Sequence, residues 1–409
     1  MIARVDGRVV LVSGAIPGER VAVRVDRVGK GVAYASTVAV EDGSPDRVDP
    51  ATDPLCGGCL YAHIGYQRQL DLKAEVIADA FTRIGRIAWS MAIPVAPSRV
   101  DGYRMRARLH VRGGQVGFFR EETNDVCDAR ATRQLLPATM DAVEGLVEAM
   151  GGRGTRLSGT IDLAENAEAT ERVAHLDVTP QGASGWLRGG SLPPGLTGLT
   201  VPAHVPGADR LVELSGSPYV RDAMVIGGYS IALRRHVLSF FQGNRYVVDD
   251  LVTHVIDRIP VGSRVVDLYA GTGLFAVSAA VVRGAGVVAV EGDRLSALDL
   301  AENSLPAGGR VAPTRQSVEA FTRDLAGRAR APVEVLIVDP PRAGMTREAL
   351  TGAIGLGAGR VVYVSCDVAT LARDARRLLD AGYVIRGVDA FDLFPNTPHV
   401  ETVVVFDRP

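Results

Sequence analysis

From about Val237 to its end, the chain alternates short apolar runs with helical stretches, and this alternation restricts the fold more than any other feature. The apolar runs cover residues 264–268, 286–290, 333–338, 360–364 and 401–406. Strands that are apolar along their whole length are buried on both faces, as they are in a parallel sheet covered by helices. The pattern therefore predicts a doubly wound, Rossmann-like α/β domain in residues 226–409.

The first of these predicted strands leads directly into a glycine-rich turn, Asp267-Leu-Tyr-Ala-Gly-Thr-Gly273. Glycines here let the backbone approach a ligand, and such domains bind ligands at the carboxyl ends of their strands. About 20 residues later the second strand ends in Glu291, which can bind two ribose hydroxyls. A dinucleotide-binding turn would have a third glycine where Ala276 stands, so the loop resembles the adenosylmethionine loop of class I methyltransferases instead.

Two later strand ends carry further polar residues. Asp339 opens the run Asp-Pro-Pro-Arg342, where this fold places its catalytic floor. Enzymes that methylate exocyclic amines carry an aromatic residue at the position of Arg342, so the arginine favours a different acceptor atom. Cys366 follows the strand at 360–364 in Ser-Cys-Asp, and we expect its thiol at the ligand-binding edge rather than in the core.

Five motifs occur in one order along the chain, namely Phe-Phe-Gln242-Gly-Asn, the 267–273 loop, Asp339-Pro-Pro-Arg-Ala-Gly, Ser-Cys366-Asp and His-Val-Glu401-Thr. The set resembles the RNA 5-methyluridine (uracil-C5) methyltransferase family, whose class I enzymes use S-adenosyl-L-methionine on tRNA or ribosomal RNA. Residues 12–21 and 44–47 resemble the TRAM domain of that family. The resemblance covers nearly the whole chain and is weakest between residues 140 and 225.

The resemblance implies a covalent mechanism. Uracil C5 is a poor nucleophile until a thiolate adds to C6 and generates an enolate. Cys366 is implied as the nucleophile and Glu401 as the base that removes the C5 proton. Both must face one pocket, and the pocket should lower the thiol pKa or assist its deprotonation. The residues implied to bind S-adenosyl-L-methionine are Gln242, Tyr269, Gly271, Glu291 and Asp339.

The rest of the chain divides into three predicted parts. Residues 1–42, with short strands and tight turns, predict a small β-barrel of the TRAM or OB type. Residues 43–99 contain a Cys-x-x-Cys segment and an amphipathic helix at 66–84. Residues 100–225 alternate strands with Gly- and Pro-rich turns around one helix, which predicts a β-rich middle domain that contacts RNA.

The RNA-binding surface has to be local, because the net charge of the chain is −2. Residues 101–120 hold five arginines against one carboxylate, a local charge of +4. Arg104, Arg106 and Arg108 recur at period two, which places them on one strand face as candidate phosphate contacts, and Arg342 is a further candidate substrate contact. The target base must leave its stack to reach Cys366, which predicts base flipping or a loop substrate.

The four cysteines are too few for a disulfide scaffold. Members of the resembled family often bind a 4Fe–4S cluster through a Cys-x5-Cys-x2-Cys run and a distant fourth cysteine. Cys56 and Cys59 match the last two positions of that run, whereas Pro50 and Thr132 stand at the other two ligand positions. Because a cubane cluster needs four ligands, the cluster is doubtful and we expect a degenerate site.

Three residues are candidates to replace the missing ligands. A local shift would bring Cys127 to the cluster position, and Asp49 or Asp53 could substitute for a thiolate. The covalent mechanism above does not need the cluster.

The primary expectation is therefore an S-adenosyl-L-methionine-dependent RNA (uracil-C5)-methyltransferase. One alternative is a methyltransferase for another base or a small molecule, which would not need Cys366 paired with Glu401. A second is a non-catalytic RNA-binding protein that keeps a methyltransferase shell. We expect a cytoplasmic monomer with no membrane association, because no apolar run reaches the roughly 20 residues of a membrane span and the start resembles no signal peptide. The residues do not identify the RNA or the uridine.

Overall fold

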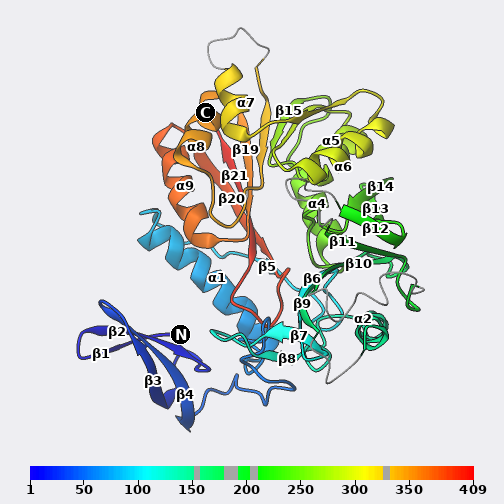
Figure 1. Ribbon diagram of the computed structural model, residues 1–409. Helices are drawn as coiled ribbons and strands as arrows, with labels where there is room; N and C mark the ends of the chain where they lie inside the picture. The colour runs from blue at the N-terminus through cyan, green and yellow to red at the C-terminus, as the bar shows by residue number, and fades with distance from the viewer. Residues whose placement is uncertain (152–156, 179–191, 203–210, 326–331) are drawn as a thin grey trace.

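The computed structural model describes residues 1–151, 157–178, 192–202, 211–325 and 332–409. In these ranges the chain forms an N-terminal four-stranded sheet, a seven-stranded middle sheet, a two-stranded hairpin and an eight-stranded C-terminal sheet covered by helices (Figure 1). Within the same ranges, no helix has the length and apolar character needed to span a bilayer.

The eight-stranded sheet carries the predicted Rossmann-like core. Its strand order is β17-β16-β15-β18-β19-β21-β20-β5, and β21 alone runs antiparallel to its neighbours. The chain leaves β15 first toward β16 and later returns to β18, so the strand order reverses beside β15, where open α/β sheets bind their ligands. The strands are β5 (Val95–Ala96), β15 (Arg264–Leu268), β16 (Gly286–Glu291), β17 (Val311–Arg315), β18 (Val335–Val338), β19 (Arg360–Ser365), β20 (Val384–Phe391) and β21 (Glu401–Asp407).

Helices cover both faces of this sheet, as the apolar strands predict. Successive strand residues point to opposite faces, and Val265 joins one core cluster while Val266 joins the other. The first cluster includes side chains of α4 (Val248–Ile256), α5 (Leu274–Arg283) and α6 (Arg294–Asn303), which is followed by the short 3-10 helix η2 (Leu305–Ala307). The second includes side chains of α1 (Tyr66–Arg83), α7 (Val318–Leu325), α8 (Arg347–Gly355) and α9 (Val368–Asp380).

The helix predicted at 66–84 is confirmed as α1, and it belongs structurally to the C-terminal sheet. It packs along α9, and Ile77 and Phe81 enter the second core cluster. The short strand β5 follows and pairs in parallel with the end of β20, with Val95 opposite Ala390. Figure 1 shows α1 reaching from this edge of the sheet toward the N-terminal strands.

The middle part is β-rich, as predicted. Its seven-stranded sheet has the order β12-β11-β10-β9-β6-β7-β8, with α2 (Pro137–Ala149) packed against it. The hairpin that follows packs on α4, α5 and α6, and it spans the predicted boundary at residue 225. The strands are β6 (Arg106–Arg112), β7 (Gln115–Phe119), β8 (Val126–Asp128), β9 (Ser158–Glu165), β10 (Arg172–Val178), β11 (Gly198–Pro202) and β12 (Leu211–Gly216), and those of the hairpin are β13 (Tyr219–Ile226) and β14 (Tyr229–His236).

The N-terminal sheet has the strand order β1-β2-β4-β3, with a small core that includes Val10, Val12 and Ala33. Its loop carboxylate Glu19 accepts hydrogen bonds from Arg47 and from the backbone N–H of Ile16, and these bonds help lower the pKa of Glu19 to about 2. The ion pair fastens the sheet to the segment that follows it. The strands are β1 (Ile2–Val5), β2 (Arg8–Ser13), β3 (Arg20–Val28) and β4 (Val32–Asp42).

Candidate active site

One cavity of about 600 Å³ lies at the carboxyl ends of β15, β16, β18 and β19. It is the place that the reversal of strand order predicts for a ligand. Its lining includes all the residues that the sequence suggested for catalysis and cofactor binding, and it also includes Arg342, one of the four candidate substrate arginines. The suggested catalytic and cofactor residues are Gln242, Tyr269, Gly271, Glu291, Asp339, Cys366 and Glu401.

Strand register brings Cys366 and Glu401 together. β21 runs antiparallel to β19, with Ser365 opposite Thr402. Cys366 directly follows β19 and Glu401 is the first residue of β21, and both line the cavity. Glu401 is paired with Phe391 of β20 and is 2% exposed. The two side chains required by the covalent mechanism therefore share one edge of one cavity.

The thiol is surrounded by groups with opposing effects on its pKa. Burial, together with the Glu401 and Asp339 carboxylates, raises the pKa of Cys366 to about 12. The Arg342 guanidinium opposes this, since its charge and its hydrogen bond to the sulfur favour the thiolate. Of the two expected effects, a lowered thiol pKa is therefore not found, and assisted deprotonation stays a prediction. Arg342 is the side chain placed to assist deprotonation.

Buried carboxyl groups dominate the floor of the cavity. Burial raises the pKa of Asp339 to about 7, although Gln242 Nε2 donates a hydrogen bond of 3.2 Å to its Oδ2. Burial and the nearby Asp339 raise the pKa of Glu401 well above its ordinary value, while Arg342 opposes the rise. Clustered buried acids of this kind favour a cation placed beside them.

The glycine-rich loop has the backbone conformation that its sequence predicts. Tyr269, Gly271 and Gly273 all have positive φ, and a Cβ at Gly273 would lie 2.9 Å from Leu300 Cδ1, so the turn requires glycine there. Gly271 N–H donates to Glu291 Oε2 at 2.8 Å, so the acid at the end of β16 fixes the loop at the end of β15.

Several side chains of the cavity were not singled out from the sequence. Phe240, Phe394 and Ser296 line it, and Phe240 is 59% exposed. Asp267 lies outside this lining and is fully buried, and burial, Asp339 and Glu291 raise its pKa well above the ordinary value. Two features of the sequence could have identified such residues, namely the aromatic pair directly before Gln242 and the position of Asp267 near the end of its strand.

The three arginines of the predicted basic strand face have different contacts, and their role in RNA binding stays a prediction. Arg104 precedes β6 and donates to Gln134 Oε1 at 2.6 Å, and Arg108 pairs with Asp162 at 2.8 Å. Arg106 instead lies near Phe240, a lining residue of the cavity, with its guanidinium carbon 5.6 Å from the ring centroid. Desolvation lowers the pKa of Arg106 to about 10, which still leaves it cationic at neutral pH. The three arginines therefore have separate environments.

The cysteine segment does not fit a 4Fe–4S cluster. Cys56 forms a disulfide with Cys127, and Cys59 is a buried free thiol. Thr132, at the position of the fourth ligand, donates its hydroxyl to the Ala129 carbonyl. In the part of the chain that the structure describes, no three His, Cys, Asp or Glu residues are placed to hold a metal ion. The suggested metal pair Cys56 and Cys59 is thus corrected to the disulfide Cys56–Cys127. The carboxylate alternative Asp53 pairs with Arg120.

Two protein-family models match parts of this chain. A family model described as tRNA (Uracil-5-)-methyltransferase matches residues 209–409, and the TRAM domain model matches residues 1–38.

Similar curated proteins extend the match over the whole chain. The 23S rRNA (uracil(1939)-C(5))-methyltransferase RlmD of Azoarcus sp. (strain BH72) is 30% identical, over 100% of this chain and 96% of that protein. The protein of the same name from Methylococcus capsulatus is 32% identical, over 100% of this chain and 94% of that protein. An uncharacterized RNA methyltransferase of Thermotoga maritima is 29% identical, over 98% of this chain and 94% of that protein.

A solved structure shares the fold. The crystal structure of Pyrococcus abyssi tRNA (uracil-54, C5)-methyltransferase, in complex with S-adenosyl-L-homocysteine, has a TM-score of 0.71 to this chain. The sequences are 24% identical, and the match covers 98% of this chain and 96% of that one.

Proposed function

Because the chain belongs to the RNA (uracil-C5)-methyltransferase family, we propose that it methylates uracil C5 through a covalent bond from Cys366 Sγ to uracil C6, with Glu401 as the base. The observation that carries the proposal is the pairing of β19 with β21, which sets the thiol against the carboxylate in one cavity. Methylation that needs no addition to the ring would require no such pair.

The proposed reaction transfers a methyl group to uracil C5 in three steps. The Cys366 thiol gives its proton to solvent water, and the thiolate adds to C6, which makes C5 nucleophilic. S-adenosyl-L-methionine, when bound, would supply the methyl group from its sulfonium to C5 and would be left as S-adenosyl-L-homocysteine. Glu401 then takes the proton from C5, the C5–C6 double bond re-forms, and the Cys366 thiolate leaves. The raised pKa of Glu401 suits a group that must accept a proton.

The cofactor half of the cavity fits S-adenosyl-L-methionine chemically. A sulfonium and an α-ammonium group are cations, and Asp339, an acid whose pKa burial raises, lines the cavity. The buried acid Asp267 lies outside the lining but close enough for its charge to interact with Asp339. Glu291 is held in place by the backbone N–H groups of Gly271 and Asp293, with carboxylate lone pairs remaining for ribose hydroxyls. We assign Gln242 the role of holding Asp339 in place. We assign Tyr269 a position beside the cofactor.

Arg342 has a proposed role in activating the thiol. Its charge lowers the pKa of Cys366 against the effect of burial, Glu401 and Asp339. A sulfonium beside the same carboxylates would add a second positive charge and favour the thiolate further. We therefore expect the thiolate to form mainly once the cofactor site is filled.

The mouth of the cavity fits a flipped pyrimidine. Phe240 is exposed there, Phe394 lines the wall, and the Arg106 guanidinium lies over the Phe240 ring. Aromatic faces stack on unpaired bases, and a guanidinium binds the adjacent phosphate. We assign the N-terminal sheet and the middle sheet, residues 1–42 and 100–225, to contact the surrounding RNA.

For the substrate we propose 23S ribosomal RNA, since relatives that match the whole chain carry the name 23S rRNA (uracil(1939)-C(5))-methyltransferase. The tRNA named for the Pyrococcus abyssi enzyme is the second RNA to test. We propose that the enzyme acts as a cytoplasmic monomer.

A trapping experiment tests the mechanism. Fluorine at C5 cannot be removed as a cation, so RNA that contains 5-fluorouridine should stay bonded to the enzyme after methyl transfer. Wild type with S-adenosyl-L-methionine should give a denaturation-resistant adduct, and Cys366→Ala none. Separate reactions with 23S rRNA and tRNA transcripts, followed by mapping of the methylated nucleotide, identify the substrate. An equal yield of adduct from Cys366→Ala would overturn the proposal.

A further inference from the structure

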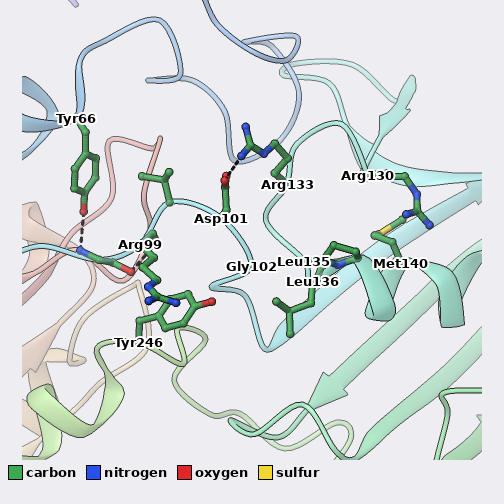
Figure 2. Close-up of a pocket in the computed structure, with 13 residues that line it drawn as sticks. Tyr66, Arg99, Asp101, Gly102, Arg130, Arg133, Leu135, Leu136, Met140 and Tyr246 are labelled. Carbon is green, nitrogen blue, oxygen red and sulfur yellow. Dashed lines mark hydrogen bonds and ion pairs between the residues drawn. The ribbon is translucent and has the colours of Figure 1, made fainter.

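A second cavity, of about 820 Å³, lies outside the candidate active site. It forms where the segment Ser98–Gly102, the loop from Arg130 to Leu136 and Tyr246 come together (Figure 2). Cavities of this size hold small ligands. None of the catalytic or cofactor residues named above lines it.

The lining combines an apolar floor with cationic and aromatic walls. Leu135 and Met140 are buried in the floor beside Leu136 and Pro137. On the wall, the Arg99 guanidinium carbon lies 5.1 Å from the centroid of the Tyr246 ring. Figure 2 shows these two side chains next to each other across the cavity from Arg130 and Arg133. Apolar surface, an aromatic ring and guanidinium groups are what a nucleotide contacts.

The three arginines differ in their charge partners. Arg133 pairs with Asp101, and Arg130 pairs with Asp141 and Glu144. Within the part of the chain that the structure describes, Arg99 has no ion pair with a carboxylate, and it is exposed. Its charge is therefore available to a phosphate, whereas the exposed Arg133 is already paired with Asp101.

One loop of the chain contributes lining residues to both cavities. Phe240, Phe241 and Gln242 line the cavity of Cys366, and Tyr246, four residues beyond Gln242, lines the second one. Asn244 lies between them, fully buried, and its Nδ2 donates to Ser98 Oγ at 2.9 Å and to the Leu393 carbonyl at 3.2 Å. One fixed loop thus borders both cavities.

From this arrangement we propose that the second cavity binds an unstacked nucleotide of the RNA substrate, near the uridine that is methylated. The proposal rests on the proposed function for its substrate class. The base would stack against Tyr246 over the apolar floor, and Arg99 would hold its phosphate. Because residues of the 240–246 loop line both cavities, the loop would fix the distance between this nucleotide and the target uracil.

Photo-cross-linking of the full-length protein tests the proposal directly. The probes are transcripts of 23S rRNA and tRNA in which 5-iodouridine replaces part of the uridine, and the label bonds to an aromatic ring in contact. Mass spectrometry should find RNA on the peptide that begins at Tyr246, in wild type and equally in Cys366→Ala. Cross-links confined to other aromatic residues would overturn the proposal.

Matched variants give a second measurement. Tyr246→Ala should weaken RNA binding about tenfold, as expected for loss of one stacked base, while Tyr246→Phe keeps the affinity. Arg99→Glu, at an exposed position where folding is not at risk, should weaken binding at least as much, and Arg310→Glu, exposed near β17, should not. Binding unchanged in both Tyr246→Ala and Arg99→Glu would exclude the subsite.

The two proposals fail in different ways. If wild type forms no 5-fluorouridine adduct but cross-links at Tyr246, the subsite stands and the covalent mechanism falls. If the adduct forms with unchanged yield and unchanged RNA affinity in Tyr246→Ala and Arg99→Glu, the mechanism stands and the subsite falls.

Discussion

Lys73 and Asp392 form an ion pair in which both side chains are fully buried, and it joins α1 to the segment that leads from β20 to Glu401. Lys73 Nζ also donates to the Phe394 carbonyl at 3.1 Å, and Tyr66 donates to the Asp392 carboxylate at 2.9 Å. A helix from the N-terminal half of the chain therefore holds the wall of the catalytic cavity.

Removing one partner of this pair should destabilise the protein strongly. Lys73→Met keeps the volume but leaves Asp392 buried without its cation, which costs about 3–5 kcal/mol of unfolding free energy. Urea unfolding measures the loss, and adding Asp392→Asn should recover most of it. On the same helix, Arg83→Ala breaks only an exposed pair with Asp79 and should cost less than about 0.5 kcal/mol. Equal losses for the two single variants would contradict the role of the buried pair.

Glu401→Gln should allow the bond between Cys366 and uracil C6 to form but should prevent release of the RNA. The thiolate can still add to C6, but no carboxylate accepts the C5 proton, so a covalent RNA adduct accumulates even with unmodified uridine. Turnover should fall by at least about 100-fold. Denaturing gels and methyl-transfer rates measure the two effects. The matched control is Glu334→Gln, at a surface ion pair with Arg264, which should turn over normally. Rapid turnover by Glu401→Gln would remove Glu401 from the role of base.

Arg342→Gln should make Cys366 less reactive, because the guanidinium favours the thiolate. With the pKa of Cys366 already raised to about 12, its alkylation by iodoacetamide should accelerate with pH throughout the range from 7 to 10. At fixed pH the variant should react about tenfold more slowly, the effect of one pKa unit. Peptide mass spectrometry measures both rates, and Arg347→Gln, exposed on α8, is the control. Identical rates for the three proteins would show that Arg342 does not act on the thiol.

The stability of the protein should fall as Asp339 ionises. Its pKa is raised from 3.8 to about 7 in the folded chain, so between these values the folded state binds more protons than the unfolded state. The stabilisation that Asp339 contributes is complete below pH 3.8 and declines as the pH rises toward about 7. Asp339→Asn should therefore be more stable than wild type at pH 8, by roughly 2–4 kcal/mol, with a smaller difference at pH 5.

Urea unfolding at the two pH values tests this expectation. Asp380→Asn, which removes an exposed carboxylate on α9, should show no such pH dependence. A constant difference between Asp339→Asn and wild type would mean that Asp339 ionises normally.

The disulfide should make the protein sensitive to reducing agents. Cys56 and Cys127 are 71 residues apart, and closing a loop of that length stabilises a protein by about 4 kcal/mol. Non-reduced protein should titrate as two thiols, Cys59 and Cys366. Cys127→Ser should lower the urea midpoint, and reductant should bring wild type down to the same value. Four titratable thiols in non-reduced protein would contradict the bond.

The sequence predicted the catalytic sheet well because its signals are local. Apolar runs followed by glycine or acid identified β15, β16, β18 and β19, and parallel strands necessarily bring their carboxyl ends to one edge. Local pattern also identified α1 and most of β2, β3 and β4.

Features that depend on distant contacts were not predictable in this way. The partner of Cys56 lies on β8, and the partner of Lys73 lies 319 residues further along the chain. The central strand β9 was missed, although its buried end pairs with both β6 and β10. The basic strand face was predicted from period two alone, but its arginines met partners on three different segments: Gln134, Asp162 and Phe240.

The short strand β5 has a consequence for any fragment of this protein. It covers the outer backbone of β20 next to Phe391, and α1 supplies the cation for Asp392. A recombinant piece that begins at residue 226 would lose both, and would present an open row of unpaired amide and carbonyl groups beside an uncompensated carboxylate. Such open rows recruit other chains, so the isolated methyltransferase part should self-associate where the full-length chain does not.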